Sequence, residues 1–478
     1  MPNQYQDTII DHETMFSNIV AQSPFGTFLG VSQEVFDLVW SNLTAEDGNS
    51  AIYVSMEIGA DLDVFNPIKN YLSQNEIANS KNPVLNSLIN KTLHGPSKIP
   101  NYGGGLGILA GDTLKSFSAC KVPVAAISLL YRKGYFSQLV DSKVGQISWA
   151  AEWNPEDTPS LYLLKNPNFP DKPLIIEIPF ISGKEKVDMA YAQVWMKLEA
   201  NEALDFFVPE FLLDFSLPES PEWIRDASNH LYDSSSEQMK AIQRRMLGAG
   251  VMPLLDILNL TAKTIHLNEQ HGVISVLHLI ADSLLQKLGP SYQENVTDSD
   301  ILEAAQKVSQ KVVYTIHTPV KAGHDRFERS LYAGLSHKVC RRILGLLAGD
   351  KDNPELYNFT EFAMQVNRAV NSVSRLHRDV TKKQFPKYAD KITAITNGVH
   401  HLTWISDAKA EVFDSFPELN GWRQNPAAFV NTESLLTNKK FRTYIEKAWQ
   451  HDTEVLIQYV NNMLIMHRNQ IEETWIDP

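Results

Sequence analysis

Cysteine is scarce in this sequence, because the 478 residues contain only Cys120 and Cys340. The two lie far apart along the chain, so the sequence offers neither a disulfide framework nor a cysteine pair for a structural zinc site. We predict no metal site. Cysteine usage of this kind is typical of a reducing compartment, which favours a cytoplasmic location.

Runs of lysine and arginine are also absent, and the net charge is −13, from 43 basic and 56 acidic residues. We therefore predict no nucleic-acid partner and no anionic membrane partner, since both are bound through clustered positive charge. A small molecule that carries phosphate remains compatible with this balance, because backbone dipoles can hold an anion inside an acidic protein.

Long hydrophobic runs are missing too. The longest, at residues 122–131, reads VPVAAISLLY and has about half of the ~20 residues that a membrane-spanning helix needs. The first residues read MPNQYQDTIIDHETMF, with no basic segment followed by an apolar core, so no signal peptide is predicted. We expect a soluble, cytoplasmic protein.

What the chain does contain is a regular alternation of helical and extended segments. The predicted strands cover residues 51–59, 122–131, 263–267, 312–318 and 391–399, and the predicted helices cover residues 106–119, 236–257, 270–288, 298–310 and 360–383. Such alternation is typical of an α/β fold with a mainly parallel sheet flanked by helices. Residues from about 145 to 225 differ: they are rich in proline and aromatics and predict a β-rich insertion with antiparallel strands at 173–180 and 190–198.

Four of the five positions 103–107 are glycines, Gly103, Gly104, Gly105 and Gly107, at the start of the predicted helix 106–119. Glycine is preferred where a ligand must come very close to the backbone, and a helix N-terminus behind it suits an anion. The alternative is a tight turn that only leads into the helix. Both interpretations stay open at this point.

Polar side chains follow three of the predicted strands, in the segments HLNEQH (266–271), IHTPVKAGHDRF (316–327) and TNGVHHLTW (396–404). Six of the 14 histidines fall in these segments. Each could be an ordinary structural histidine, but ligands of open α/β sheets sit outside the carboxyl ends of the strands, so three such clusters favour a polar crevice there.

Several sharper motifs fail. HLNEQH lacks the spacing of a zinc-protease helix, and no phosphate-loop pattern ending in Gly-Lys-Ser/Thr occurs. GLGILA (105–110) fits the dinucleotide pattern G-x-G-x-x-A, but no strand precedes it and no acidic residue ends the strand that follows.

Taken together, the segments resemble the α-glucan phosphorylase family, which acts on glycogen, starch and maltodextrin. The resemblance runs from about residue 48 to the end. This part of the chain is similar to the amino-terminal half of the bacterial and archaeal members. The segments that carry it are YVSMEIG, YGGGLGILAGDTLKSFSACKVPVAAISLLYRKGYF, WNPEDTP, EQMKAIQRRMLGAG, HLNEQHG, YTIHTPVKAGHDRF, VNSVSRLHRDV and ITNGVHHLTW.

The resemblance implies a GT-B glycosyltransferase that converts α-1,4-glucan and inorganic phosphate reversibly to glucose 1-phosphate, with pyridoxal 5'-phosphate as cofactor. It implies a helical N-terminal extension at 1–45 and a Rossmann-like domain at 46–478, with a linker helix at about 437–472 and the carboxy-terminal GT-B domain absent. Family members are often dimers, so a homodimer is one assembly that the resemblance allows.

The resemblance also implies roles for individual residues. His317 matches the histidine whose backbone carbonyl lies beside the reacting glucose. The amides of Gly104, Gly105 and Leu106 are expected to face the sugar and its phosphate. Polar residues expected to line the cleft are Glu57, Glu269 and His271.

The match also has breaks. The segment with the cofactor lysine belongs to the family's carboxy-terminal half, and no similar segment occurs in these 478 residues. Ser372 replaces a glycine of the family pattern, and Gln270 is bulkier than its usual counterpart. Two hypotheses follow: the chain is the amino-terminal half of a phosphorylase, as a fragment or as one part of a split enzyme, or it is an inactive glucan-binding or regulatory relative. We expect no phosphorolysis from this polypeptide without a partner half.

Overall fold

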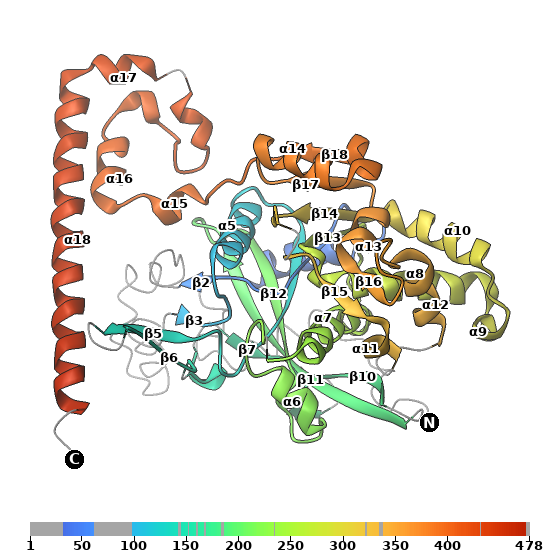
Figure 1. The fold of residues 1–478 in the computed structure, drawn as a ribbon. Helices are drawn as coiled ribbons and strands as arrows, with labels where there is room; N and C mark the ends of the chain where they lie inside the picture. Colours follow the sequence, from blue (N-terminus) through green and yellow to red (C-terminus); the bar gives the residue numbers. More distant parts are fainter. Residues whose placement is uncertain are drawn as a thin grey trace. The chain divides into compact units, whose positions relative to one another are not determined.

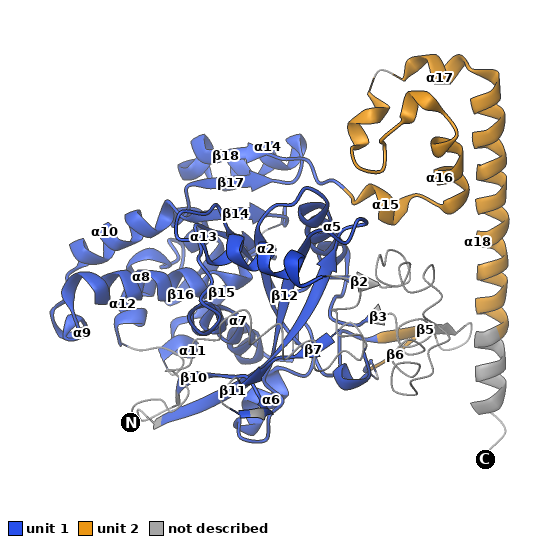
Figure 2. Ribbon diagram, turned by 180° about the vertical axis from the view of Figure 1, so that it is seen from behind, with its two compact units in different colours: residues 1–136, 150–398 blue, residues 137–149, 399–478 orange. Residues whose placement is uncertain are grey.

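The computed structural model describes residues 32–61, 98–141, 145–151, 153–158, 161–166, 169–182, 186–233, 235–320, 323–333, 338–430 and 432–474. The chain divides into two compact units (Figure 2). Residues 1–136 and 150–398 make up the first, and residues 137–149 and 399–478 make up the second. The predicted boundary at residue 46 remains a prediction.

A ten-stranded sheet forms the centre of the first unit (Figure 1). Seven of its strands run parallel, in the order β12 (Phe207–Asp214), β4 (Val124–Leu129), β1 (Ala51–Ser55), β13 (Thr264–Asn268), β14 (Val312–Ile316), β17 (Ala369–Ser372) and β18 (Ile392–Ala394). Three antiparallel strands extend it beyond β12: β11 (Lys186–Ala200), β10 (Ile175–Ser182) and β7 (Leu161–Leu163). The predicted mainly parallel sheet is therefore confirmed. Strands β7, β10 and β11 lie in the segment for which the β-rich insertion was predicted.

Helices cover both faces of the parallel strands, because successive side chains of a buried strand point to opposite sides. On one face Tyr53, Val124 and Ala126 pack against α5 (Gly105–Ala119). On the other, Ile52 and Val54 join the large core that includes α2 (Gln33–Thr44), α7 (Glu237–Ile257) and α8 (Ile274–Leu288). All six residues of β4 are buried, as its apolar run predicted.

The predicted helix at 360–383 is wrong. The segment forms α13 (Phe359–Gln365), then strand β17, then α14 (Arg375–Gln384). Strand β17 pairs with β14 and β18, so sheet pairing overrides the local helical pattern. Two further boundaries move: β18 is shorter than the predicted 391–399, and α10 (Asp298–Ser309) takes its N-cap from Thr297, one residue before the predicted start.

The remaining elements of the first unit are short or peripheral. They are α6 (Glu222–Ala227), α9 (Tyr292–Asn295), α11 (Arg329–Ala333), α12 (Lys338–Leu347), the 3-10 turns η2 (Pro155–Asp157), η3 (Gln270–Gly272) and η5 (Pro386–Lys391), and the strand pairs β2 (Ala60–Asp61) with β3 (Lys98–Ile99), β8 (Lys165–Asn166) with β9 (Phe169–Pro173), and β15 (Arg326–Glu328) with β16 (Leu356–Asn358).

The second unit has a small core of its own around Phe416, Leu419 and Trp422. Its elements are β5 (Ser137–Asp141), β6 (Gly145–Trp149), α15 (His401–Trp404), α16 (Asp407–Asp414), η6 (Pro417–Leu419), η7 (Pro426–Phe429), α17 (Glu433–Thr437) and α18 (Lys439–Thr474). The long helix predicted at about 437–472 is therefore present as α18.

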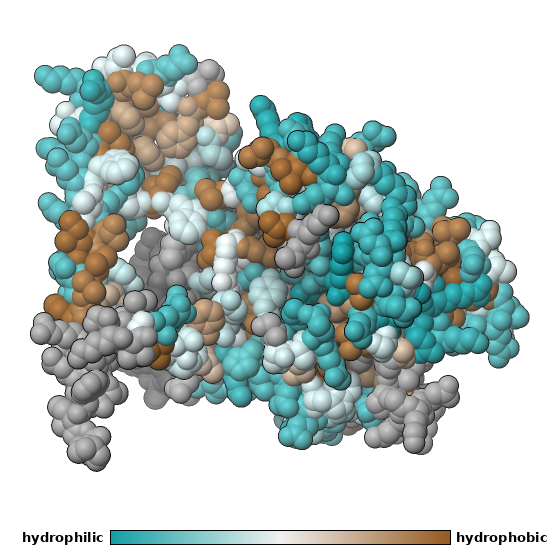
Figure 3. All heavy atoms as spheres, viewed as in Figure 1, coloured by the Kyte–Doolittle hydropathy of each residue, from teal (hydrophilic) through white to brown (hydrophobic). Residues whose placement is uncertain are grey.

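Helix α18 exposes apolar side chains between residues 455 and 465 (Figure 3). They are Val455, Leu456, Ile457, Val460, Leu464 and Ile465. Within the described ranges no helix combines the length and hydropathy that crossing a bilayer requires.

Candidate functional site

The predicted site residues gather at the carboxyl ends of three neighbouring parallel strands. Glu57 follows β1 by two residues, Glu269 comes directly after β13, and His317 comes directly after β14. Strands β1, β13 and β14 are adjacent and parallel, so these residues meet at one edge of the sheet. This is the edge where open α/β sheets bind ligands.

The glycine loop, residues 103–107, is attached to this edge through Glu57. The backbone N–H of Gly103 donates to Glu57 Oε2 at 2.7 Å, and the hydroxyl of Tyr232 donates to Oε1 at 2.8 Å. Glu57 is buried. Burial raises the pKa of its carboxyl, and the hydrogen bonds from Gly103, Tyr232 and the Gly104 backbone oppose that rise.

The glycines of this segment fall into two groups. A Cβ on Gly107 would stand 2.5 Å from Cβ of Tyr102, and one on Gly111 would stand 2.2 Å from the carbonyl oxygen of Gly59. These two glycines allow α5 to pack against the chain that follows β1. A Cβ on Gly104 or Gly105, by contrast, would meet nothing within 4 Å, and both residues are exposed.

The amino end of α5 begins at this exposed pair. Gly104 is its N-cap and supplies no side-chain hydrogen bond, and the first turn contains no acidic residue. The first amides of a 15-residue helix therefore point out of the loop with the positive end of the helix dipole, an arrangement that suits an anion. Leu106, which is half-buried, lies in the same turn.

Glu269 is held in an unusual backbone conformation. Its φ is +64°, in the left-handed region that residues other than glycine seldom adopt. Its carboxylate oxygen Oε1 accepts the N–H of His317 at 2.8 Å and the hydroxyl of Thr318 at 2.9 Å. Burial raises the pKa of this carboxyl to about 7, against the opposing effect of those hydrogen bonds. Glu269 thus fixes the start of the loop after β14.

The side chain of His317 starts a hydrogen-bonded path across three strands. Its Nε2 lies 2.8 Å from Oδ1 of Asn268, whose amide donates to Ser55 Oγ at 3.1 Å. The Ser55 hydroxyl donates in turn to the backbone carbonyl of Glu57 at 2.6 Å. Burial lowers the pKa of His317 to about 4, so the imidazole is neutral near pH 7.

His271 lies against Tyr232, with the ring centroids 5.6 Å apart and an edge-on geometry. Burial, followed by the nearby charge of Arg244, lowers the pKa of His271 to about 3. Arg244 itself pairs with Asp325 at 2.7 Å. Tyr232 and His271 therefore connect the glycine loop with the ends of β13 and β14.

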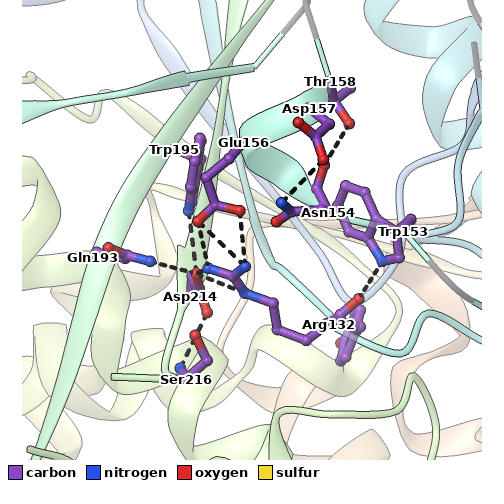
Figure 4. Close-up of polar contacts among 11 residues, drawn as sticks. Arg132, Trp153, Asn154, Glu156, Asp157, Thr158, Gln193, Trp195, Asp214 and Ser216 are labelled. Atoms are coloured by element: carbon purple, nitrogen blue, oxygen red, sulfur yellow. Dashed lines mark hydrogen bonds and ion pairs between the residues drawn. The ribbon is translucent and has the colours of Figure 1, made fainter. Parts of the chain in front are cut away.

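A second polar cluster surrounds Asp214, at the carboxyl end of β12 (Figure 4). Asp214 is fully buried and accepts four groups: Arg132 at 2.5 Å, Gln193 at 2.7 Å, Ser216 N–H at 3.0 Å and Trp195 at 3.2 Å. Arg132 also pairs with Glu156 at 3.2 Å. Arg132 bonds both Asp214 of β12 and Glu156 of η2, so this cluster holds the segment around η2 against the sheet.

The buried lysines of the described residues do not fit the Schiff-base role that pyridoxal phosphate requires. Although burial alone would lower it, the carboxylates of Glu199 and Glu210 raise the pKa of Lys197, which stays an ammonium in mid-strand. Lys115 lies ten residues into α5, about 15 Å from its amino end. Lys391 is half-buried, and burial lowers its pKa to about 8. It lies just before β18, at the amino end of the last strand of the sheet and so away from the carboxyl ends.

Sequence reasoning named Glu57, Glu269, His271, His317 and the glycine loop, and the structure brings them to one edge. It did not single out Asn268, Tyr232, Arg244 or Asp325. Asn268 stood inside a recognised strand-end cluster. Arg244 stands beside Arg245 in α7, and both are buried, which the charged residues of that helix did not reveal in the sequence. The sequence around Tyr232 contained no motif or periodicity that pointed to a role in the site.

Comparisons with known proteins give several relatives, while no family model matches the chain. A maltodextrin phosphorylase of Thermococcus litoralis is 32% identical over 335 residues, which are 68% of this chain and 37% of the relative. A glycogen phosphorylase of Mycobacterium tuberculosis is 31% identical over 335 residues, which are 64% of this chain and 35% of the relative. One from Aquifex aeolicus is 26% identical over 326 residues, which are 66% of this chain and 43% of the relative. The matches thus span well under half of each relative.

Proposed function

We propose, from the premise that this chain is a relative of the α-glucan phosphorylases, that it carries the amino-terminal part of a phosphorylase site. The relationship predicted from the motifs is confirmed by the named relatives, at 26–32% identity. The proposed reaction is phosphorolysis of α-1,4-glucan to glucose 1-phosphate, in a cleft of a GT-B enzyme.

The observation that carries the proposal is the exposed pair Gly104 and Gly105 at the amino end of α5. Neither position has an atom within 4 Å of a would-be Cβ, and Glu57 holds the loop to the sheet edge. A sugar phosphate at this place would lie against backbone amides and a helix dipole, which stabilise an anion without rearranging during the reaction.

The other residues have positioning and binding roles in this proposal. Glu269 orients the loop after β14, so that the backbone carbonyl of His317 can face the glucose unit. The neutral imidazole of His271 and the carboxylate of Glu57 line the same edge. Pyridoxal phosphate, if bound, would supply acid–base chemistry at the substrate phosphate through its own phosphate group. The lysine that holds the cofactor belongs to the family's carboxy-terminal half, and the matched residues make up 35–43% of these relatives.

The test uses calorimetry to measure binding of glucose 1-phosphate and of a maltodextrin by the purified chain. Phosphate-dependent release of glucose 1-phosphate is then assayed with the chain alone and with a phosphorylase carboxy-terminal half added. We expect millimolar or tighter binding to the chain and turnover only in the mixture.

Each outcome decides between the two hypotheses. Maltodextrin binding with no turnover in any mixture would favour the inactive glucan-binding relative. If neither ligand binds and no mixture turns over, the proposed site is wrong.

A further inference from the structure

Tyr232 has no role in the proposed reaction as described above, yet it is held in a strained conformation next to the candidate site. It lies in the loop between α6 and α7, with φ at +53°, a left-handed conformation that costs a tyrosine about 1–2 kcal/mol. Such strain persists only where the surroundings hold the residue firmly. Here its ring contacts both the His271 ring and the Arg244 guanidinium, at centroid distances of 5.6 Å and 5.9 Å.

The hydroxyl of Tyr232 completes the coordination of Glu57. Gly103 N–H donates to Oε2 of Glu57 and the Tyr232 hydroxyl donates to Oε1, while the Gly104 backbone adds a further hydrogen bond to the carboxylate. A carboxylate held at one oxygen can rotate about its last side-chain bond, whereas one held at both oxygens has a fixed plane. The orientation of the acceptor for Gly103 therefore depends on Tyr232.

We propose that Tyr232 is a positioning residue for the glycine loop and acts on it through Glu57. The hydroxyl sets the plane of the carboxylate, the carboxylate sets the place of Gly103, and Gly103 sets where the amides at the start of α5 point. A role of Tyr232 in catalysis rests on the proposed function, whereas its effect on the position of the glycine loop does not.

The substitution Tyr232→Phe tests this, because it keeps the ring and its contacts and removes only the hydroxyl. We expect amide hydrogen exchange at Gly103 to become about five- to tenfold faster, the effect of losing one ordinary hydrogen bond. The middle of α5, at Leu114, should keep its wild-type rate. Tyr332→Phe is the matched control: it removes a buried hydroxyl that donates to Ala241 on α7, away from Glu57.

A double-mutant cycle separates positioning from ordinary packing. Glu57→Ala is expected to speed exchange at Gly103 on its own, and Tyr232→Phe should then add nothing, because the route through the carboxylate is already cut. Glu57→Gln, whose amide oxygen can still accept from Gly103 while its NH₂ group faces the tyrosine oxygen, should restore most of the protection. Equal effects of Tyr232→Phe in both backgrounds, or no effect in either, would overturn the proposal.

The functional arm measures the dissociation constant of glucose 1-phosphate for the wild type and for Tyr232→Phe. Weaker binding by the variant, alongside faster exchange at Gly103, is the expected result. Faster exchange with no binding by the wild type would keep the positioning role and refute the proposed function. If Tyr232→Phe leaves both the exchange rate of Gly103 and the binding of glucose 1-phosphate unchanged, the positioning role is refuted and the proposed function is kept.

Discussion

At the scale of single residues, the glycines of one segment serve two different purposes. Gly107 and Gly111 are needed inside the protein, because any Cβ there would overlap Tyr102 or the carbonyl of Gly59. Gly104 and Gly105 have no such internal reason. Their lack of side chains leaves open space at the amino end of α5, which is where an external ligand would need it.

Alanine substitutions at Gly105 and Gly111 should therefore behave in opposite ways. Gly105→Ala is expected to change the free energy of unfolding by less than about 0.5 kcal/mol and to weaken glucose 1-phosphate binding strongly. Gly111→Ala should destabilise the fold by about 1–3 kcal/mol through overpacking. Urea unfolding and calorimetry check both, and unchanged binding in Gly105→Ala would mean that the loop is only a turn.

Glu269 should give the stability of the protein a measurable pH dependence. Burial raises the pKa of its carboxyl from 4.5 to about 7, so the folded protein holds this proton more tightly than the unfolded chain does. The stability that it contributes is complete below about pH 4.5 and is lost as the pH rises to about 7.

Glu269→Gln removes this contribution while it keeps an acceptor for His317. Relative to the variant, the wild type should lose about 1.4 kcal/mol of unfolding free energy per pH unit between about pH 4.5 and 7. The buried histidines are common to both proteins, so their opposite contribution cancels in the difference. Urea unfolding over this pH range would contradict the prediction if the difference stayed constant.

At the scale of elements, the carboxyl ends of the parallel strands carry Glu57, Glu269 and His317 together. Residues 55–57 at the end of β1, 268–269 at the end of β13 and 317–318 after β14 hydrogen-bond to one another at the carboxyl ends of these strands. Asp214 joins further elements at the same ends, linking β12 and β11 to the segment that follows β4 (Figure 4). One buried carboxylate thus adds side-chain links to the backbone pairing of β11 with β12.

Removing that carboxylate should be costly. Asp214→Ala leaves Arg132, Gln193 and Trp195 without their shared acceptor, and we expect a loss of about 3 kcal/mol in unfolding free energy. Asp205→Ala is the control, because its pair with Lys121 is about half exposed and should contribute at most about 1 kcal/mol. Equal losses in chemical denaturation would show that the buried network has no special weight.

At the scale of the whole molecule, the chain has two compact units with separate apolar cores. The first unit's cores contain the sheet and its helices, and the second unit's core lies between residues 410 and 448. The candidate site described above belongs to the first unit alone. The stability of the second unit should therefore be separable from the geometry of the site.

Trp422→Ala tests this separation. Trp422 is 2% exposed in the second unit's core and donates to Asp414 at 2.9 Å. Its loss should destabilise that unit by about 3–5 kcal/mol, as large-to-small changes in cores do. Hydrogen exchange should then speed up in α16 and stay unchanged in β1 and β13. A parallel loss of protection in β1 would show that the two units unfold as one.

Local patterns in the sequence were enough to predict much of this. The apolar run of β4, the glycines before α5 and the polar residues after β1, β13 and β14 are consecutive in sequence, and strand or helix periodicity is a property of consecutive residues. They predicted the parallel sheet and a polar crevice at the carboxyl ends of its strands. Glu57, Glu269, His271 and His317 were assigned to that crevice only through the family resemblance.

Only the tertiary structure decided the rest, because it depends on groups that are distant in sequence. Strand β17 looked helical and became a strand through pairing with β14 and β18. Tyr232 lies 175 residues from Glu57, and no local pattern reveals their hydrogen bond. Which glycines serve packing and which face outward likewise follows from where Gly59 and Tyr102 approach α5. Contacts of this kind are fixed by the folding of the whole chain.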